Sequence, residues 1–315
     1  MRPTGGPGSE PKFSSRAASL WLALALVAEV ATAGDLVRTV RFKLSAGDLA
    51  SGESAVENYR RATGVDPEYL DGVGWLARGA QLLGRPDVAA GYVAELRREI
   101  PGEKPELIVP LGAAIEVEGK LRAARGGRGD ALRFLEGELA RATDVALRSR
   151  IWKNINLLSL EGQSAPELSY GDSAASARLR LSDLKGKPVL LFFWAHGCGD
   201  CKAQAASLVS VYQKYRPQGL TLIAPTRVYG FDGEGKAVKP DEEKSEIRKV
   251  WAEVYKGLEG VSVPIDAETM VRYGASATPT FALVDRAGVV RFYTPTRLTE
   301  AALSRRIEEV LAEAP

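Results

Sequence analysis

The sequence contains few of the residues that most often carry metal or acid–base chemistry. Among 315 residues there are two cysteines, two methionines and one histidine, His196. A structural zinc site takes about four ligands, so the supply falls short unless carboxylates or a second chain contribute. A serine-hydrolase triad is equally unsupported, because the histidine lies two residues before a cysteine and nothing organises a triad around it. We therefore expect no metal and no bound cofactor.

A strong charge of either sign is also missing. The chain has 42 Lys and Arg residues against 40 Asp and Glu residues, which gives a formal net charge of +2. Nucleic acids and anionic membranes attract proteins through concentrated basic surfaces, whereas the basic residues here are interleaved with acidic ones. We therefore predict no nucleic-acid partner.

Long hydrophobic runs are absent, and the longest apolar stretch lies near the N-terminus. It covers residues 17–28, ends at Glu29, and follows three basic residues, Arg2, Lys12 and Arg16. Crossing a bilayer takes about 20 apolar residues, so a cleaved signal peptide fits better than an uncleaved anchor. Ala31-Thr32-Ala33 matches a small-x-small cleavage site. We predict a signal peptide over 1–33, export to the periplasm or another extracytoplasmic space, and only transient membrane contact.

The two cysteines, Cys198 and Cys201, follow the apolar run 189–194. A strand that enters Cys-x-x-Cys at a helix N-terminus directs free N–H groups at the first sulfur and favours its thiolate. The i, i+3 spacing brings the sulfurs close enough for a reversible disulfide. A disulfide that closes such a short loop stabilises the folded state little, so a redox function explains the pair better than a structural role does. Cys198 is the expected nucleophile and Cys201 the expected resolving residue.

Residues 34–163 are expected to form a helical domain. Four positions recur one tetratricopeptide period later: Ala55, Tyr59, Ala62 and Pro67 reappear as Ala89, Val93, Leu96 and Pro101. The region thus resembles about one and a half tetratricopeptide units, with a generic helical bundle as the alternative. A turn is expected at 126–129. Alternating apolar and charged residues over 36–44 predict a short strand or an extended lead-in.

Residues 164–315 are expected to form a second domain, because 161–166 is polar, small and ends in proline. Strand and helix patterns alternate beyond this boundary, which predicts an α/β fold with a mixed sheet flanked by helices. The expected strands are 179–181, 189–194, 220–225, 261–265, 280–285 and 289–293. The expected helices begin at Cys198 and span 241–258 and 299–311.

Four features of this half occur in a specific order: Gly186-Lys187-Pro188, Phe193-Trp194-Ala195 before Cys-x-x-Cys, a long insertion over 229–258, and Ala277-Thr278-Pro279-Thr280 before a strand. Together they resemble the thioredoxin fold and, within it, the secreted TlpA/ResA-like disulfide reductases. The resemblance covers 164–315. It implies a thiol:disulfide oxidoreductase whose partners are protein disulfide substrates and an upstream electron donor.

The resemblance also implies roles for residues around the cysteines. Pro279 is expected to have a cis peptide bond beside the sulfurs, and Thr278 to offer its backbone to an extended substrate segment. Trp194 is expected to support the site. The alternative is that Pro279 only starts a strand. Two departures stand out: Gly197 replaces the tryptophan of many relatives, which widens access, and Phe192 replaces the buried carboxylate of thioredoxin.

Three further residues are candidates for tuning the redox pair. Asp200 opposes negative charge on sulfur and shifts the couple toward reductant, whereas Lys202 opposes that effect. His196 is either a thiolate tuner or proton shuttle, or a surface loop residue that is near the pair by chance.

Two functions are consistent with these features. The first is an exported thiol:disulfide oxidoreductase that acts as a reductase. The second is a partner-binding scaffold or redox-sensitive adaptor that uses the helical repeats and has little turnover.

Overall fold

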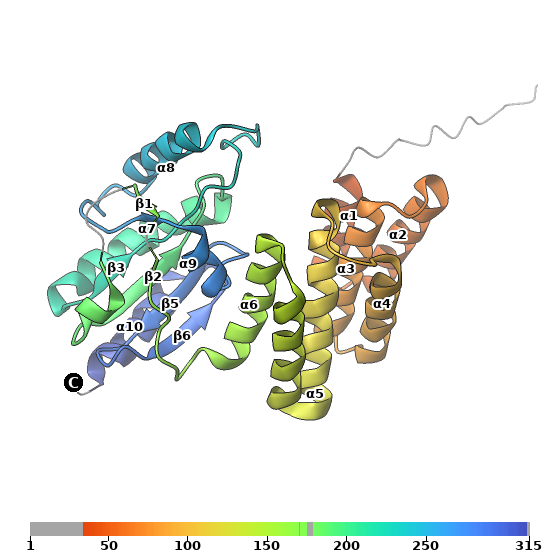
Figure 1. Cartoon of the computed structure of the whole chain (residues 1–315), viewed down its shortest axis with the longest axis horizontal. Helices are drawn as coiled ribbons and strands as arrows, with labels where there is room; N and C mark the ends of the chain where they lie inside the picture. The colour runs from red at the N-terminus through yellow and green to blue at the C-terminus, as the bar shows by residue number, and fades with distance from the viewer. Residues whose placement is uncertain (1–33, 170, 175–178, 314–315) are drawn as a thin grey trace, which may run out of the picture. The chain divides into compact units, whose positions relative to one another are not determined.

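The structure, a computed structural model, describes residues 34–169, 171–174 and 179–313. The expected signal peptide lies outside the described residues. A helical region comes first and an α/β region follows, coloured from red to yellow-green and from green to blue in Figure 1. The prediction of a thioredoxin-like α/β fold preceded by helices is confirmed. Within the described residues, no helix has both the length and the apolar character needed to cross a membrane.

The helical region packs around one apolar core. Its deepest side chains include Leu76, Leu96, Ile115 and Ile151, contributed by four different helices. The helices are α1 (Asp35–Ser45), α2 (Leu49–Thr63), α3 (Pro67–Leu82), α4 (Pro86–Glu99), α5 (Ile108–Arg141) and α6 (Val145–Ser159).

The first segment is helix α1, so the prediction of a strand over 36–44 is wrong. Leu36 and Val40 are four residues apart and both buried, which is the period of one helix face. Glycines on α3 make room for this face: a side chain at Gly79 would collide with Leu44. The sequence alternates apolar and charged residues, but it also has a helical period. Packing of that helical face against α3 decides that the segment is a helix.

Helix α5 reverses direction at a glycine. Gly127 has φ 79° within an otherwise helical run, a conformation that glycine adopts without strain. A Cβ on Gly119 would lie 3.1 Å from Leu135 Cδ2, so the two parts of α5 fold back on each other. The predicted turn at 126–129 is therefore confirmed.

The α/β region contains a four-stranded sheet of order β3-β2-β5-β6. Strand β2 pairs in parallel with β3 and antiparallel with β5, which pairs antiparallel with β6. The bounds are β2 (Val189–Phe193), β3 (Thr221–Ile223), β5 (Thr280–Val284) and β6 (Val290–Thr294), with a separate pair β1 (Asp172–Ser173) and β4 (Pro264–Ile265). The helices are α7 (Gly199–Tyr215), α8 (Pro240–Val254), α9 (Ala267–Arg272) and α10 (Glu300–Ala312).

Helices cover both faces of this sheet. Leu190 and Phe192 of β2 join a core with α7, α8 and α10, while Leu191 and Phe193 join a second core with α9. This alternation explains why β2 is apolar throughout.

The strand expected at 179–181 is wrong. Residues Leu181–Leu184 form a 3-10 helix, because the N–H groups of Leu181 and Ser182 donate to the carboxylate of Glu167 instead of to a strand. The segment expected as the domain boundary is tied to β6, since Gly162 N–H donates to the Val290 carbonyl and Val290 N–H to the Gln163 carbonyl.

Candidate active site

The two cysteines meet at the start of α7, immediately beyond β2. Cys198 is the N-cap of α7, Cys201 lies in its first turn, and a disulfide joins them with Cα atoms 5.2 Å apart. The Cys201 N–H points at Cys198 Sγ at 3.0 Å. This N–H and the positive end of the helix dipole both favour a thiolate at Cys198 once the disulfide is reduced.

The two sulfurs differ in access. Cys201 is completely buried, whereas Cys198 is partly exposed. An incoming thiolate or disulfide can therefore reach Cys198 and not Cys201, which is the arrangement that an exchange reaction with a fixed order of attack needs.

The loop before β5 lies against the exposed sulfur. Thr280 pairs with Phe193 across the antiparallel β5 and β2, and this register carries the preceding residues to the cysteines. The Thr278–Pro279 bond is cis, as predicted, and the Thr278 carbonyl oxygen is 3.4 Å from Cys198 Sγ. Thr278 is partly exposed and Pro279 is buried. Of the two residues, Thr278 is thus the one that solvent reaches beside the sulfur.

Trp194 and Phe192 form the apolar support beneath the cysteines. Trp194 is fully buried, donates from Nε1 to the Ala224 carbonyl at 3.1 Å, and packs against Trp251 and Tyr255. It therefore presents no surface to a substrate. Phe192 packs against Tyr255 and Phe281, so the space of the thioredoxin carboxylate is filled by hydrocarbon.

His196 is completely buried, so its interpretation as a surface loop residue is wrong. Its Nε2 lies 3.0 Å from the carbonyl oxygen of Phe231 and, because a carbonyl only accepts, carries the hydrogen. Its Nδ1 faces Glu243 Oε1 at 3.7 Å, beyond hydrogen-bond distance. The ring thus connects the cysteine loop to the long insertion.

Glu243 is a structural residue of the site that the sequence reasoning missed. It is fully buried at the start of α8, and its two carboxylate oxygens accept from Tyr229 N–H at 2.6 Å and Gly230 N–H at 2.7 Å. A signal was present, because Glu243 precedes Ile247 and Trp251 by four and eight residues and shares their buried face. This carboxylate fastens the loop at the start of the insertion to α8, which lies later in the same insertion.

The fastened loop places an aromatic ring beside Gly197, the residue before the nucleophile. Phe231 is 39% exposed, and a Cβ on Gly197 would lie 3.9 Å from its ring. The expectation that Gly197 leaves this side of the sulfur open is therefore wrong in part, because Phe231 supplies an aromatic surface from elsewhere in the chain. Phe231 lies in a polar, glycine-containing loop, so the sequence pattern did not indicate that it would lie near the cysteines.

Replacing Phe231 with alanine is expected to lower kcat/KM for a protein disulfide substrate about tenfold, through loss of a partly exposed aromatic contact. Insulin reduction by the purified full chain measures it. Phe231→Tyr, which keeps the ring, should retain most of the activity. Equal losses with insulin and with a small aromatic disulfide would instead indicate damage to the sulfur site.

The charges around the pair are more balanced than the sequence suggested. Asp200 and Lys202 are both exposed, and Arg297 Nη1 lies 3.4 Å from Asp200 Oδ1. Because Arg297 opposes the field of Asp200, the shift toward reductant is smaller than Asp200 alone would give. Within the described part of the chain, no three His, Cys, Asp or Glu side chains are grouped to hold a metal.

Comparison with known proteins agrees with this geometry. Residues 162–230 match the AhpC/TSA family. Thiol-disulfide oxidoreductase ResA from Bacillus subtilis is 30% identical over 148 residues, which cover 45% of this chain and 72% of that protein. ResA from Geobacillus thermodenitrificans is 27% identical over 153 residues, 47% of this chain and 77% of that protein.

Among solved structures, a thiol:disulfide interchange protein DsbE from Chlorobium tepidum is 24% identical with a TM-score of 0.39, covering 48% of this chain and 98% of its own. A disulfide at the head of α7, a cis-proline loop beside it and the identity to the Bacillus subtilis protein lead to one conclusion. This chain belongs to the ResA-like thiol-disulfide oxidoreductases of the thioredoxin superfamily.

Proposed function

We propose that the protein is an exported thiol:disulfide reductase in which Cys198 attacks and Cys201 resolves. The single observation that carries this order is the unequal burial of the sulfurs: Cys198 is partly exposed and Cys201 is completely buried. The backbone N–H aimed at Cys198 supports the same order, since it stabilises the attacking thiolate.

The reaction proceeds by two exchanges that together move two electrons. The Cys198 thiolate attacks one sulfur of a target disulfide, which forms a mixed disulfide and releases the other target sulfur as a thiolate that takes up a proton. Cys201 loses its proton and attacks Cys198 Sγ, which re-forms the Cys198–Cys201 disulfide and releases the second target thiolate. A dithiol donor must then reduce the pair for another cycle.

The residues around the sulfurs have supporting roles in this proposal. Thr278 and Pro279 form the edge on which an extended substrate segment lies, with the Thr278 backbone 3.4 Å from the nucleophile. Trp194 holds the end of β2 in place. His196, Asp200 and Lys202 tune the pair, with His196 acting through its contact with the insertion.

The N-terminal sequence supports the proposal of export, and the change of composition along the chain supports the proposed division into domains. We propose that the mature chain begins at Gly34, that 34–163 and 164–315 are separate domains, and that the protein works in the periplasm or another extracytoplasmic space. The tetratricopeptide-like repeat stays a prediction. Intact mass of the protein from an extracytoplasmic fraction tests the cleavage, and a chain that still begins at Met1 would refute it.

The direction of electron flow is tested by the reduction potential of the purified mature protein. We expect a value nearer to the about −270 mV of thioredoxin than to the about −120 mV of DsbA. Equilibration with dithiothreitol and glutathione buffers, read by alkylation of Cys198, measures it. A potential near that of DsbA would make the protein an oxidant and overturn the proposed direction.

A further inference from the structure

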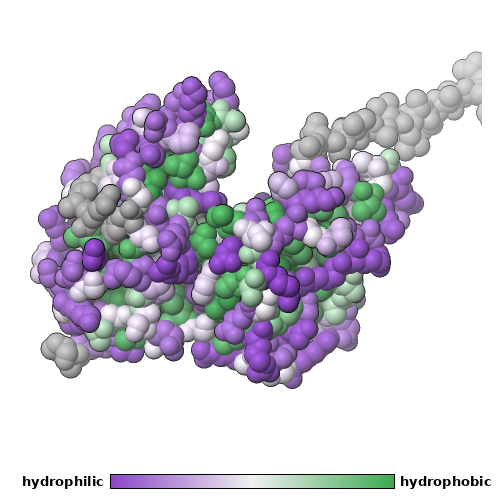
Figure 2. Space-filling model, viewed as in Figure 1, coloured by the Kyte–Doolittle hydropathy of each residue, from purple (hydrophilic) through white to green (hydrophobic). Residues whose placement is uncertain are grey.

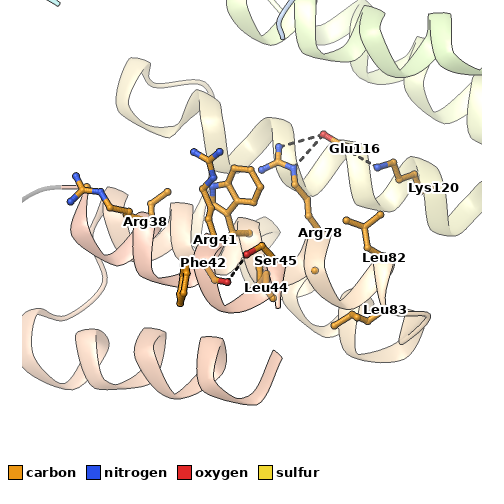
Figure 3. Close-up of a pocket in the computed structure, with 14 residues that line it drawn as sticks. Arg38, Arg41, Phe42, Leu44, Ser45, Arg78, Leu82, Leu83, Glu116 and Lys120 are labelled. Carbon is orange, nitrogen blue, oxygen red and sulfur yellow. Dashed lines mark hydrogen bonds and ion pairs between the residues drawn. The ribbon is translucent and has the colours of Figure 1, made fainter. Parts of the chain in front are cut away.

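The helical region contains a recessed groove whose described lining residues come from α1, α3, α5 and the ends of these helices. Its volume is about 720 Å³. In Figure 3, Arg38 and Arg41 project from α1, while Arg78 and Lys120 come from the other two helices and approach Glu116. Of the residues that the structure describes, those that line it all belong to the helical region. The thiol-disulfide site therefore does not account for this groove.

The groove exposes large apolar side chains to water. Phe42 is 70% exposed, Leu82 77% and Leu83 43%. A second hollow of about 380 Å³ shares Leu82 with the first and extends it to Leu157 on α6, which is 46% exposed. Figure 2 shows that the visible face of the helical region is mostly hydrophilic and is interrupted by hydrophobic patches. Contiguous exposed apolar surface of this kind commonly marks a binding site.

The polar part of the groove carries a surplus of positive charge. Glu116 is 8% exposed, and its carboxylate lies within 3.4 Å of Arg78, 2.9 Å of Lys120 and 3.0 Å of Lys153. Burial alone would raise the pKa of Glu116, but these three cations hold that pKa well below its usual range, so it is ionised at neutral pH. One carboxylate thus faces three cations, of which Arg78 and Lys120 line the groove.

Arg41 adds a further positive charge at the opening. Its guanidinium stacks over Trp75 at 4.8 Å, and no acidic side chain in the described part of the chain forms an ion pair with it. The aromatic contact holds Arg41 in place without neutralising it. A charge that is held in position and has no acidic partner among the described residues is suited to an anionic group on a ligand.

We propose that this groove binds an acidic polypeptide segment with interleaved apolar side chains. The apolar side chains would fill the hollow against Phe42 and Leu82, and the carboxylates would meet Arg41 and Lys120. A membrane surface fits less well, because the groove also has a recess between helices, lined by Leu44 and Trp75, that a flat bilayer surface does not fill. The inference does not depend on the proposed exchange reaction.

The test uses three labelled 12-residue peptides with the same leucines, in which the remaining positions are all glutamate, all glutamine or all lysine. Fluorescence anisotropy with the full chain measures each Kd. The glutamate peptide should bind at least about tenfold more tightly than the glutamine peptide, and the lysine peptide should not bind. Arg41→Glu should weaken the glutamate peptide at least about tenfold and Leu82→Ser about threefold to tenfold.

Two exposed residues of the helical region that do not line the groove serve as matched control positions. Arg61→Glu and Val65→Ser change an exposed arginine and an exposed apolar residue outside the groove, and each should change Kd less than about twofold. Equal effects of control and groove variants, or no preference for glutamate, would overturn the proposal. So would Arg41-dependent binding to phosphatidylglycerol vesicles with no binding of the glutamate peptide, since that outcome assigns the groove to lipid.

Discussion

Cys198→Ser is expected to reduce the insulin-reducing activity of the purified protein on the order of a thousandfold or more. Serine keeps the size of the side chain but is not ionised near neutral pH, so the helix N-terminus no longer holds a nucleophile. Cys201 cannot take over, because its sulfur is completely buried. The loss should appear in kcat/KM, since the first attack on the target disulfide is the step removed.

Cys201→Ser serves as the matched control. It keeps the accessible nucleophile and removes the resolving sulfur, so a mixed disulfide between Cys198 and the substrate should accumulate and be visible by mass spectrometry after acid quenching. A trapped adduct on Cys201 in the Cys198→Ser variant would reverse the assignment. Unchanged partner binding with no measurable turnover in the wild type would instead favour the adaptor function.

Glu116→Gln is expected to destabilise the helical region by about 3 to 5 kcal/mol at pH 7. The variant is nearly isosteric, but it leaves Arg78 and Lys153 without the carboxylate that compensates them. The lysine is buried in the same network, where an uncompensated charge is costly. The expected loss of stability is thus caused by electrostatics and not by the formation of a cavity.

The stabilising contribution of Glu116 should depend on pH in a definite direction. The folded pKa of Glu116 lies below its ordinary value of 4.5, so its stabilising contribution is fully present above that value and is lost as the pH falls toward the folded pKa. The wild type should therefore lose stability on acidification, and the variant should lack that part of the loss. Urea unfolding at pH 7 and pH 3.5, followed by circular dichroism, measures the difference.

Glu57→Gln is a suitable control for the charge change. Glu57 forms an exposed pair with Arg61 at 3.8 Å, so its removal should cost less than about 0.5 kcal/mol at either pH. A Glu116→Gln variant as stable as this control at pH 7 would contradict the prediction, because it would show that the folded state does not need the carboxylate to compensate the three cations.

The parts of the molecule that the sequence predicts are those encoded locally. Three features can be recognised from a few neighbouring residues each. They are the continuous apolar run of β2, the Cys-x-x-Cys start of α7 and the threonine–proline pair before β5. Their mutual position then follows from the pairing of β2 with β5. The family resemblance implied only that Pro279 lies beside the cysteines, and the register that brings it there was not predicted, since spacing alone does not define a register.

The parts that the sequence did not predict depend on distant neighbours. Segment 36–44 alternates like a strand until α3 supplies a glycine-lined face for its helical period. His196 looked free to lie at the surface because its burial is caused by Tyr229 and Phe231, which come from the insertion. The position of Phe231 in turn depends on Glu243, a carboxylate on the buried face of a helix, where charge normally argues against burial.

The fastening of the insertion by Glu243 separates two properties that a redox protein must adjust. The N–H that favours the Cys198 thiolate lies inside the first turn of α7, whereas the aromatic ring is delivered by a loop that Glu243 anchors to α8. His196 meets that loop at the backbone carbonyl of Phe231, so a change of the Phe231 side chain leaves this contact in place. Substitution of that side chain is therefore expected to alter which partners are accepted while the groups proposed to tune the couple are kept.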